Sequence, residues 1–344
     1  MAHELDFSTG KAGIALRGGA SSAWHGLGQT IEDTDTLDDI RRKAGLDWTA
    51  HKAGMMFQTP DGQLRPVDNS AVIYRSDTFA PIGKVSDNRF HIVQPPEVLE
   101  FFREFCDAQR LKIETAGSLK GGRIVWALAA MGPDFDYIAP ASKMDRTSWF
   151  VRFQTAFDGS RVSSLVATSI RQVCANTEAA IERSTDGSQY KVPHCRPLNM
   201  ADLKAAFGLM GEQMRITADA WNTLQARKVT DEEARAFFMD LLGVDEAKLA
   251  EVDSKGKQVV STKLRNQLQA LAASYQRGPG AGLASADRTA YGLLQAVTHV
   301  VDHGSIVRDS YGDGPEGARL SSAWLGTGAA VKEKARSMAL ALAA

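Results

Sequence analysis

The sequence has little cysteine, almost no net charge and no long apolar run. Its 344 residues include three cysteines, an odd and widely spaced set that argues against a disulfide framework and favours a reducing, cytoplasmic setting. The formal net charge is −1, so nucleic-acid binding would have to rest on a local patch. The N-terminal residues lack the basic start and apolar core of a signal peptide, and no apolar run is long enough to span a membrane. We therefore expect a soluble cytoplasmic protein without a membrane partner.

Motifs of nucleotide hydrolysis and of hydrolase nucleophiles are also missing. The sequence has no GxxxxGKS/T loop, no GxGxxG that both follows a predicted strand and opens a helix, and no GxSxG. Cys174 has apolar neighbours, which favours an inert core thiol over a nucleophile. Two further groups, His194 with Cys195 and His299 with His303, lack additional metal ligands at a recognisable spacing. We predict no enzyme activity, no cofactor and no metal, and a metal- or cysteine-dependent enzyme that uses these residues is the third interpretation.

Three regions differ in their residue pattern. Residues 1–44 form an N-terminal arm and a short helix that begins after Thr36. Residues 45–195 carry strand and turn signals around an amphipathic helix that opens at Pro95–Pro96, and residues 196–344 carry helical periodicity. The predicted fold class is α+β, with a β-rich domain of hairpins around helices followed by a mainly helical C-terminal region.

Turn pairs place the hairpins within the β-rich region. The predicted turns are Asp61–Gly62, Asp87–Asn88, Gly121–Gly122 and Asp158–Gly159. Residues 170–183 are predicted to be helical. Thr230 is predicted to cap a C-terminal helix, and further helices are predicted over 259–276, 286–302 and 329–343.

Positive charge is concentrated in the second group of strands. Residues 110–171 contain nine lysines and arginines and five acids, a local excess of +4 that is interleaved with aromatic residues. Arginine beside aromatic side chains on a sheet suits a phosphate backbone with stacked bases, although ordinary solvated strand faces would give the same pattern. The candidate DNA-binding residues are Lys120, Arg123, Arg146, Trp149, Arg152, Arg161 and Arg171.

Several segments resemble a known family. They are AWHGLGQ (23–29), FDGS (157–160), RQVCANT (171–177), TAYGLLQAVTHVVDHG (289–304) and the C-terminal SAWLGTGAAVKEKA. Together they are similar to the DUF932 (phage/plasmid-like) family across essentially the whole chain. The family often has a histidine where this chain has Phe157, which weakens any acid–base or metal role for that turn. The resemblance implies a mobile-element setting, often near DNA-processing genes.

The order of predicted elements is also similar to that of Rad52-like single-strand annealing proteins of phages. That resemblance implies rings or filaments that hold single-stranded DNA along a basic groove. Our leading hypothesis is an ATP-independent protein of a phage or plasmid that binds and anneals single-stranded DNA as a homo-oligomer. The alternative is a phage or plasmid interaction factor, for anti-defence or host takeover, that binds a host or phage protein and has no DNA-binding role.

Overall fold

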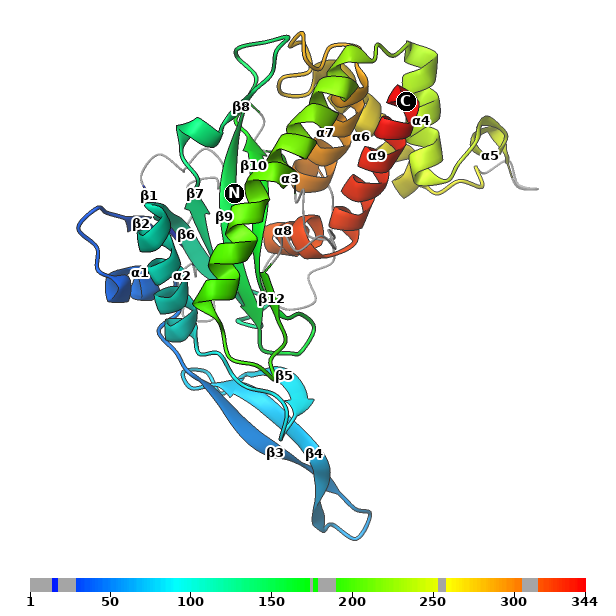
Figure 1. Ribbon diagram of the computed structural model, residues 1–344. Coiled ribbons are helices and arrows are strands. Elements are labelled where there is room, and N and C mark those ends of the chain that lie inside the picture. The colour runs from blue at the N-terminus through cyan, green and yellow to red at the C-terminus, as the bar shows by residue number, and fades with distance from the viewer. Residues whose placement is uncertain (1–13, 18–28, 174–175, 179–189, 253–257, 305–314) are drawn as a thin grey trace.

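The computed structural model describes residues 14–17, 29–173, 176–178, 190–252, 258–304 and 315–344. A large sheet with helices on both faces forms the body, and a smaller sheet projects from one end of it (Figure 1). The fold class is α+β, as predicted. Among the described residues, no helix combines the length and the apolar character needed to cross a membrane.

The main sheet is antiparallel except at one edge, where β1 and β2 run parallel. Along its path the strands are β11 (Asn176–Glu178), β10 (Ser163–Arg171), β9 (Arg146–Ala156), β7 (Ile124–Ala130), β6 (Lys112–Leu119), β1 (Ile14–Arg17) and β2 (Gln29–Ile31). Two short strands add to it: β12 (Tyr190–Val192) pairs with β10, and β8 (Tyr137–Ile138) pairs with β9.

Helices surround this sheet. They are α1 (Leu37–Lys43), α2 (Pro95–Gln109), α3 (Met200–Ala226), α4 (Asp231–Leu242), α5 (Glu246–Ala250), α6 (Thr262–Arg277), α7 (Ala290–His299), α8 (Pro315–Leu325) and α9 (Thr327–Ala343). A 3-10 turn covers Pro133–Phe135, and one π-helical turn, Val300–Gly304, continues α7.

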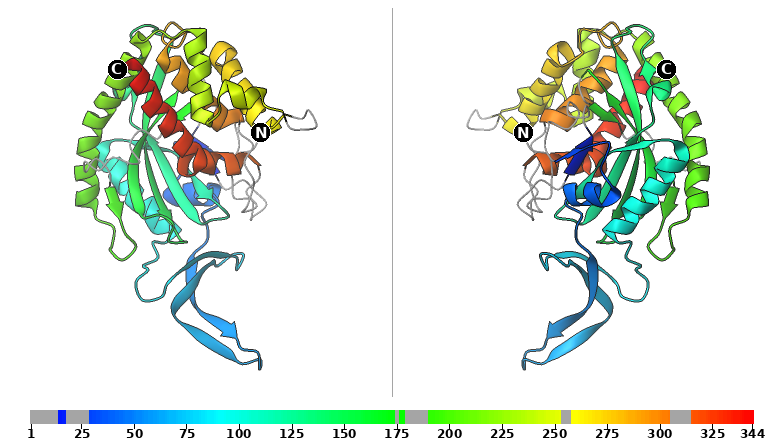
Figure 2. Two further views of the ribbon diagram at one scale, coloured as in Figure 1. Left: turned by 90° about the vertical axis from the view of Figure 1, so that its right-hand side faces the viewer. Right: turned by 90° about the vertical axis from the view of Figure 1, so that its left-hand side faces the viewer.

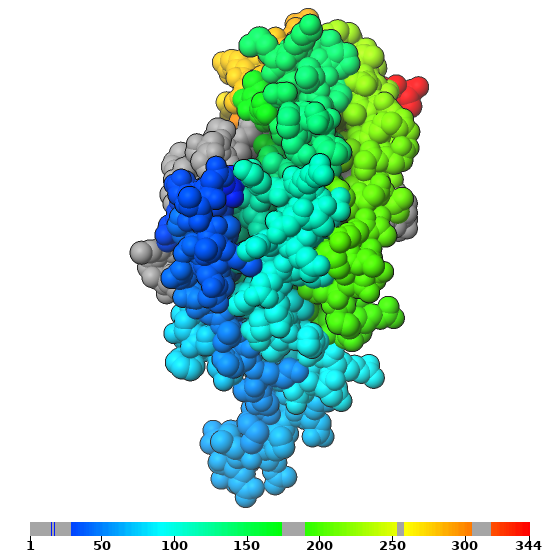
Figure 3. Space-filling view, turned by 60° about the vertical axis from the view of Figure 1, so that its left-hand side comes forward, coloured from blue at the N-terminus to red at the C-terminus, as the bar shows by residue number. Residues whose placement is uncertain are grey.

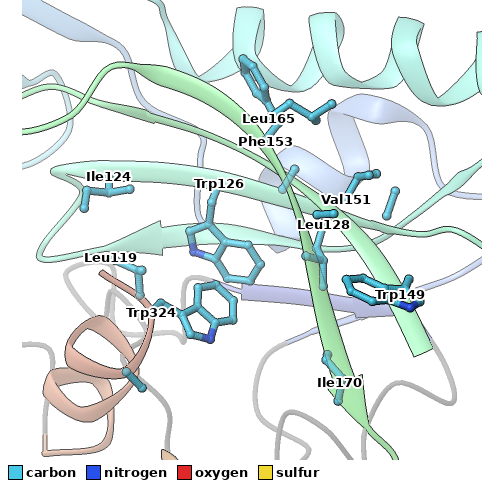
Figure 4. Close-up of a cluster of buried hydrophobic side chains, with 14 of the residues drawn as sticks. Leu119, Ile124, Trp126, Leu128, Trp149, Val151, Phe153, Leu165, Ile170 and Trp324 are labelled. Atoms are coloured by element: carbon cyan, nitrogen blue, oxygen red, sulfur yellow. The ribbon is translucent and has the colours of Figure 1, made fainter. Parts of the chain in front are cut away.

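Both faces of the main sheet are buried. On one face, Phe153 stacks on Phe102 of α2 and Trp149 stacks on Trp221 of α3, with ring centroids 6.1 and 5.6 Å apart. On the other face, Trp324 of α8 packs edge-on against Trp126 of β7 at 5.4 Å (Figure 4). Side chains alternate along β9 as the sequence predicts, but from Val151 to Ala156 neither side of the strand faces water.

The second sheet contains β3 (Ala50–Gln58), β4 (Leu64–Arg75) and β5 (Pro81–Ser86), with β4 in the centre. The β3–β4 hairpin extends well beyond β5 and forms an arm that leaves the body (Figure 3). The β3–β4 register shifts between Gly54 and Met56, opposite a β4 segment in which Asn69 has a left-handed φ of 51°. This irregularity divides the arm into a root that pairs with β5 and a distal two-stranded ribbon.

Several local predictions are confirmed. Thr36 and Thr230 each form a capping box with the third residue of the helix they precede, and Pro95 opens α2. The Asp61–Gly62, Gly121–Gly122 and Asp158–Gly159 turns each join paired strands.

Other local predictions are wrong. Residues 176–178 of the predicted 170–183 helix form β11, because this segment turns back and pairs with the end of β10. The Asp87–Asn88 turn is followed by irregular chain instead of a strand, since the segment after it leads directly into α2. The sequence also gave no prediction for α8, the helix that covers the second face of the main sheet.

Candidate nucleic-acid interface

Three of the seven predicted DNA-binding residues are buried. Trp149, Arg152 and Arg171 are 2%, 1% and 3% exposed. The Arg152 guanidinium lies over the ring of Trp324, 4.8 Å from its centroid. Their assignment as a surface that contacts DNA is therefore corrected, because bases and phosphates cannot reach side chains that α3, α7 and α8 cover. The polar alternation of β9 reflects internal contacts of the fold.

Arg171 belongs to a buried ion pair. Its Nε and Nη2 atoms each donate to Asp145 at 2.6 Å, and the Ser285 hydroxyl donates to the same carboxylate at 2.5 Å. The guanidinium also lies over Tyr291 of α7, 5.3 Å from the ring centroid. This network ties the end of β10 to the loop and helix that follow α6. The role of Arg171 in this fold is structural.

The remaining four predicted residues are at least partly exposed, and three of them lie near one end of the main sheet, because the Phe157 N–H donates to the Arg123 carbonyl and joins the β6–β7 turn to the turn before Arg161. Arg123 donates to the carbonyl oxygens of Ile82 and Pro81, which fastens the β6–β7 turn to β5. Arg161 donates to the Leu325 carbonyl at the end of α8. Arg146 pairs with Asp136 at 3.0 Å, and its side chain is 42% exposed. Lys120 lies in the β6–β7 turn with a left-handed φ of 57°. Arg146 is the first residue of β9 and lies at the opposite end of that strand from this turn, so the four residues do not form one surface.

The cysteine and histidine groups have ordinary surroundings where the structure describes them. Cys174 lies outside the described residues. The ring of His194 stacks on the ring of Phe90, with centroids 4.4 Å apart, and its Nε2 atom is hydrogen-bonded to the Arg161 carbonyl oxygen. Burial lowers the pKa of His194. His299 and His303 lie ring to ring at 4.8 Å beside a buried Asp302–Lys332 ion pair. In the described part of the chain, no three or more histidine, cysteine, aspartate or glutamate side chains are grouped to hold a metal ion.

A different aromatic group is exposed on the small sheet. His51 of β3, Tyr74 of β4 and Phe79 of the β4–β5 turn form a row, with centroid distances of 5.5 and 6.5 Å between successive rings. His51 and Tyr74 are cross-strand partners and therefore share one face of the sheet. We call these three residues the ring row. The planes of neighbouring rings differ by 31° and 25°, so successive rings are only moderately tilted relative to one another.

The ring row rests on a rigid support. The opposite face of the small sheet buries Ile73 and Ile82 against the body. Gly83 makes the closest approach, since a Cβ atom there would lie 2.1 Å from the carbonyl oxygen of Phe157. Beneath the strands, the buried Arg75 pairs with Asp77 at 2.7 Å and lies over Trp48, 4.6 Å from the ring centroid. The root of the arm is therefore fixed to the body while the ring row faces outward.

Phe79 adopts a conformation that bulky residues disfavour. Its φ is 56°, in the left-handed region, and its side chain is 75% exposed. Its backbone N–H donates to the Arg75 carbonyl at 3.1 Å, which closes the turn. Neither the backbone angle nor the exposure of a phenyl ring benefits folding, and strain of this kind is concentrated at binding sites. Stability of the fold alone would favour glycine or asparagine here.

One cation, Lys84, lies on the face of the ring row, whereas Lys52 pairs with Ile73 on the face toward the body. Lys84 is exposed on β5 and pairs in register with Val72, two residues along β4 from Tyr74 and on the same face. Within the described residues Lys84 has no carboxylate partner. Lys52 is held by the carbonyl oxygens of Asp87 and Phe90, at 2.5 and 3.0 Å, at the junction with the body. Aromatic rings with a lysine beside them on an open sheet can stack bases and contact phosphate.

Sequence reasoning missed the ring row because its members are dispersed over residues 51–79. The segment SAVIYRS predicts a strand, and it contains Tyr74, but nothing in it shows which face is covered. The register that brings His51 opposite Tyr74 depends on the Asp61–Gly62 turn and on the irregularity beyond Gly54. The left-handed turn at Phe79 has no signal in the sequence.

Comparison with known proteins covers the body of the chain. The model of a domain of unknown function, DUF932, matches residues 81–324. The chain belongs to this family. No curated protein and no solved structure matches the chain, so the Rad52-like likeness stays a prediction. The match begins at the first residue of β5, so β3, β4 and the whole ring row lie outside it.

Proposed function

We propose that this DUF932 protein binds single-stranded DNA by stacking bases on the ring row and anneals complementary strands without ATP. The observation that carries the proposal is the row of His51, Tyr74 and Phe79, in which the two outer rings are exposed and Tyr74 is half-buried, with Lys84 beside it. Stacking on aromatic side chains contributes about 1–3 kcal/mol per base and tolerates any sequence, because every base has a π-face. An annealing protein needs this tolerance.

The spacing of the rings suits an extended strand. The centroid distances of 5.5 and 6.5 Å exceed the rise of about 3.4 Å per base in a duplex strand. Bases that stack on successive rings would therefore be separated from one another, and each would present its pairing edge to solvent. A second strand could pair with such edges while the protein holds the first strand by its base faces and phosphates.

In this proposal Lys84 contacts a phosphate beside the ring row. Arg123 lies next to the same strand, β5, because its guanidinium donates to the carbonyl oxygens of Ile82 and Pro81. The proposal includes a role in recombination of a phage or plasmid, in the cytoplasm, as an oligomer. The missing nucleotide-binding motifs agree with an ATP-independent reaction.

Fluorescence anisotropy with a labelled oligothymidylate of about 20 nucleotides tests the proposal, since that length exceeds a typical single-site footprint. We expect Phe79→Ala and His51→Ala each to weaken binding about 5- to 150-fold, the range for one lost base stack. Lys84→Gln should reduce the slope of log K against log salt by about 0.7.

Two controls locate the site. Leu209→Ala removes an exposed apolar side chain of α3 and should leave binding unchanged, and Arg146→Gln removes an exposed cation of the body without altering the salt slope. Absence of binding by the unmodified chain at low salt would refute the function. Normal binding by Phe79→Ala and His51→Ala, with a reduced slope in Arg146→Gln, would instead move the site to the body.

A further inference from the structure

The distal ribbon of the arm, residues 54–69, has no cover within the described part of the molecule. Met56, Phe57 and Leu64 are 51%, 50% and 65% exposed. Met56 and Leu64 occupy one face, since their cross-strand partners Pro66 and Gln58 alternate with the Phe57–Arg65 pair. A lone two-stranded ribbon is marginally stable in water, and natural proteins avoid exposing apolar strands at open edges. The exposed apolar residues of the ribbon therefore leave it open to contact with another chain.

A second exposed apolar group lies at the opposite end of the molecule. Phe135, Ile138 and Met144, which we call the end patch, are 43%, 48% and 80% exposed. They belong to the connection between β7 and β9 that includes β8. Figures 1 and 2 show this connection at one end of the long axis and the arm at the other.

The charges of the two regions are compatible. The ribbon carries exposed Asp61, Arg65 and Asp68, and the end patch is flanked by exposed Asp134 and Lys143. Other charges of the connection are already neutralised within the fold, because Asp136 pairs with Arg146 and Asp145 with Arg171. The ribbon thus carries two anions and one cation and the end patch carries one of each, so Arg65 can meet Asp134 and one ribbon aspartate can meet Lys143, while the second aspartate has no opposite charge in the contact.

We propose that the ribbon of one copy docks on the end patch of a second copy, so that copies associate head to tail. The two contacting surfaces differ, and such a heterologous contact extends into an open chain or closes into a ring. This inference goes beyond DNA binding: it assigns the ribbon and the end patch, which are separate from the ring row. A row of copies would align their ring rows for a longer strand.

The size of the ribbon sets the strength of one contact. From Gly54 to the turn at Asp61 the ribbon is about 23 Å long, at roughly 3.3 Å per residue, and two strands are about 10 Å wide. One face therefore offers about 230 Å², well below the roughly 800 Å² per partner of a stable interface. Association should be weak and concentration-dependent.

Cysteine cross-linking tests the geometry. Leu64→Cys and Met144→Cys are made as separate variants in which Cys174 and the exposed Cys195 are replaced by serine, while the buried Cys106 is kept. Each variant alone should give little disulfide dimer on oxidation, and an equimolar mixture should give a dimer that contains one of each. Dimer formation by Leu64→Cys alone would indicate tip-to-tip contact and overturn the proposal, as would a mixture without dimer.

Sedimentation of the unmodified full chain gives a second readout. The average mass should rise with protein concentration, and Met56→Ser with Leu64→Ser should weaken association at least about tenfold, as expected for loss of an apolar anchor. Val259→Ser is the matched control, with a similarly exposed apolar side chain outside both regions. A chain that stays monomeric at every concentration would assign the ribbon to a different protein and refute self-assembly. The same variants are also tested for oligothymidylate binding by fluorescence anisotropy, so that a failure of self-association is distinguished from a failure of DNA binding.

Discussion

Removal of the Asp145 carboxylate tests whether the arginines of the main sheet act within the fold. In Asp145→Ala, the Arg171 guanidinium would keep its place at 3% exposure without the carboxylate that now accepts two of its hydrogen bonds at 2.6 Å. Breaking a buried ion pair in this way costs about 3–5 kcal/mol, a large part of the roughly 5–15 kcal/mol that stabilises a typical domain.

Urea unfolding measured by circular dichroism provides the assay. With a slope of about 2–3 kcal/mol per molar urea, the midpoint should fall by roughly 1–2 M. The double variant Asp145→Ala with Arg171→Met should recover most of this loss, because it removes both charges and fills the site with an apolar chain. Arg215→Ala breaks only exposed pairs with Glu212 and Asp219 and should hardly move the midpoint. A midpoint for Asp145→Ala equal to that of Arg215→Ala, or a double variant no better than the single one, would refute the structural role.

Two further predictions concern the small sheet and pH. Gly83→Ala should destabilise the arm root by about 1–3 kcal/mol, because its Cβ would meet the Phe157 backbone, whereas Gly54→Ala has open space and should be nearly neutral; urea midpoints decide between them. Burial lowers the pKa of His299 from its ordinary 6.5, so the fold prefers the neutral ring, and its contribution to stability is present above pH 6.5 and lost as the pH falls toward the folded pKa. His299→Gln should therefore flatten the decline of unfolding free energy below pH 6.5, and an unchanged slope would contradict this assignment.

Sequence predicted the fold class, the helix starts and three of the four hairpin turns, because interactions between residues close in the chain determine them. Capping by Thr36 and Thr230 and the glycine turns act over a few residues. Burial of the main sheet could not be read in the same way. The strand β9 alternates like a half-exposed strand, and only the distant Trp324, brought over Arg152 by α8, shows that its polar face is covered.

The candidate site was missed for the same physical reason. The exposure of a side chain depends on which distant segments pack over it in the folded protein. Trp149 and Phe79 are both aromatic residues in β-rich segments, yet Trp149 is 2% exposed and Phe79 is 75% exposed. Local charge excess marked residues 110–171, but ion pairs and carbonyl contacts already occupy many of those cations. The exposed rings come from a segment with no charge excess at all.

The irregularity at Asn69 separates the two halves of the arm mechanically. Its side-chain oxygen accepts a hydrogen bond from Ser86 and its backbone carbonyl accepts one from Asp87, so the bend is anchored to β5 and not to the ribbon. The ribbon can therefore be shortened, or exchanged for that of a relative, at a boundary that leaves the root intact. Removing two residues from each strand would keep every side chain on its face and shorten the arm by about 7 Å. The length of this hairpin would then act as a ruler for the distance between neighbouring copies.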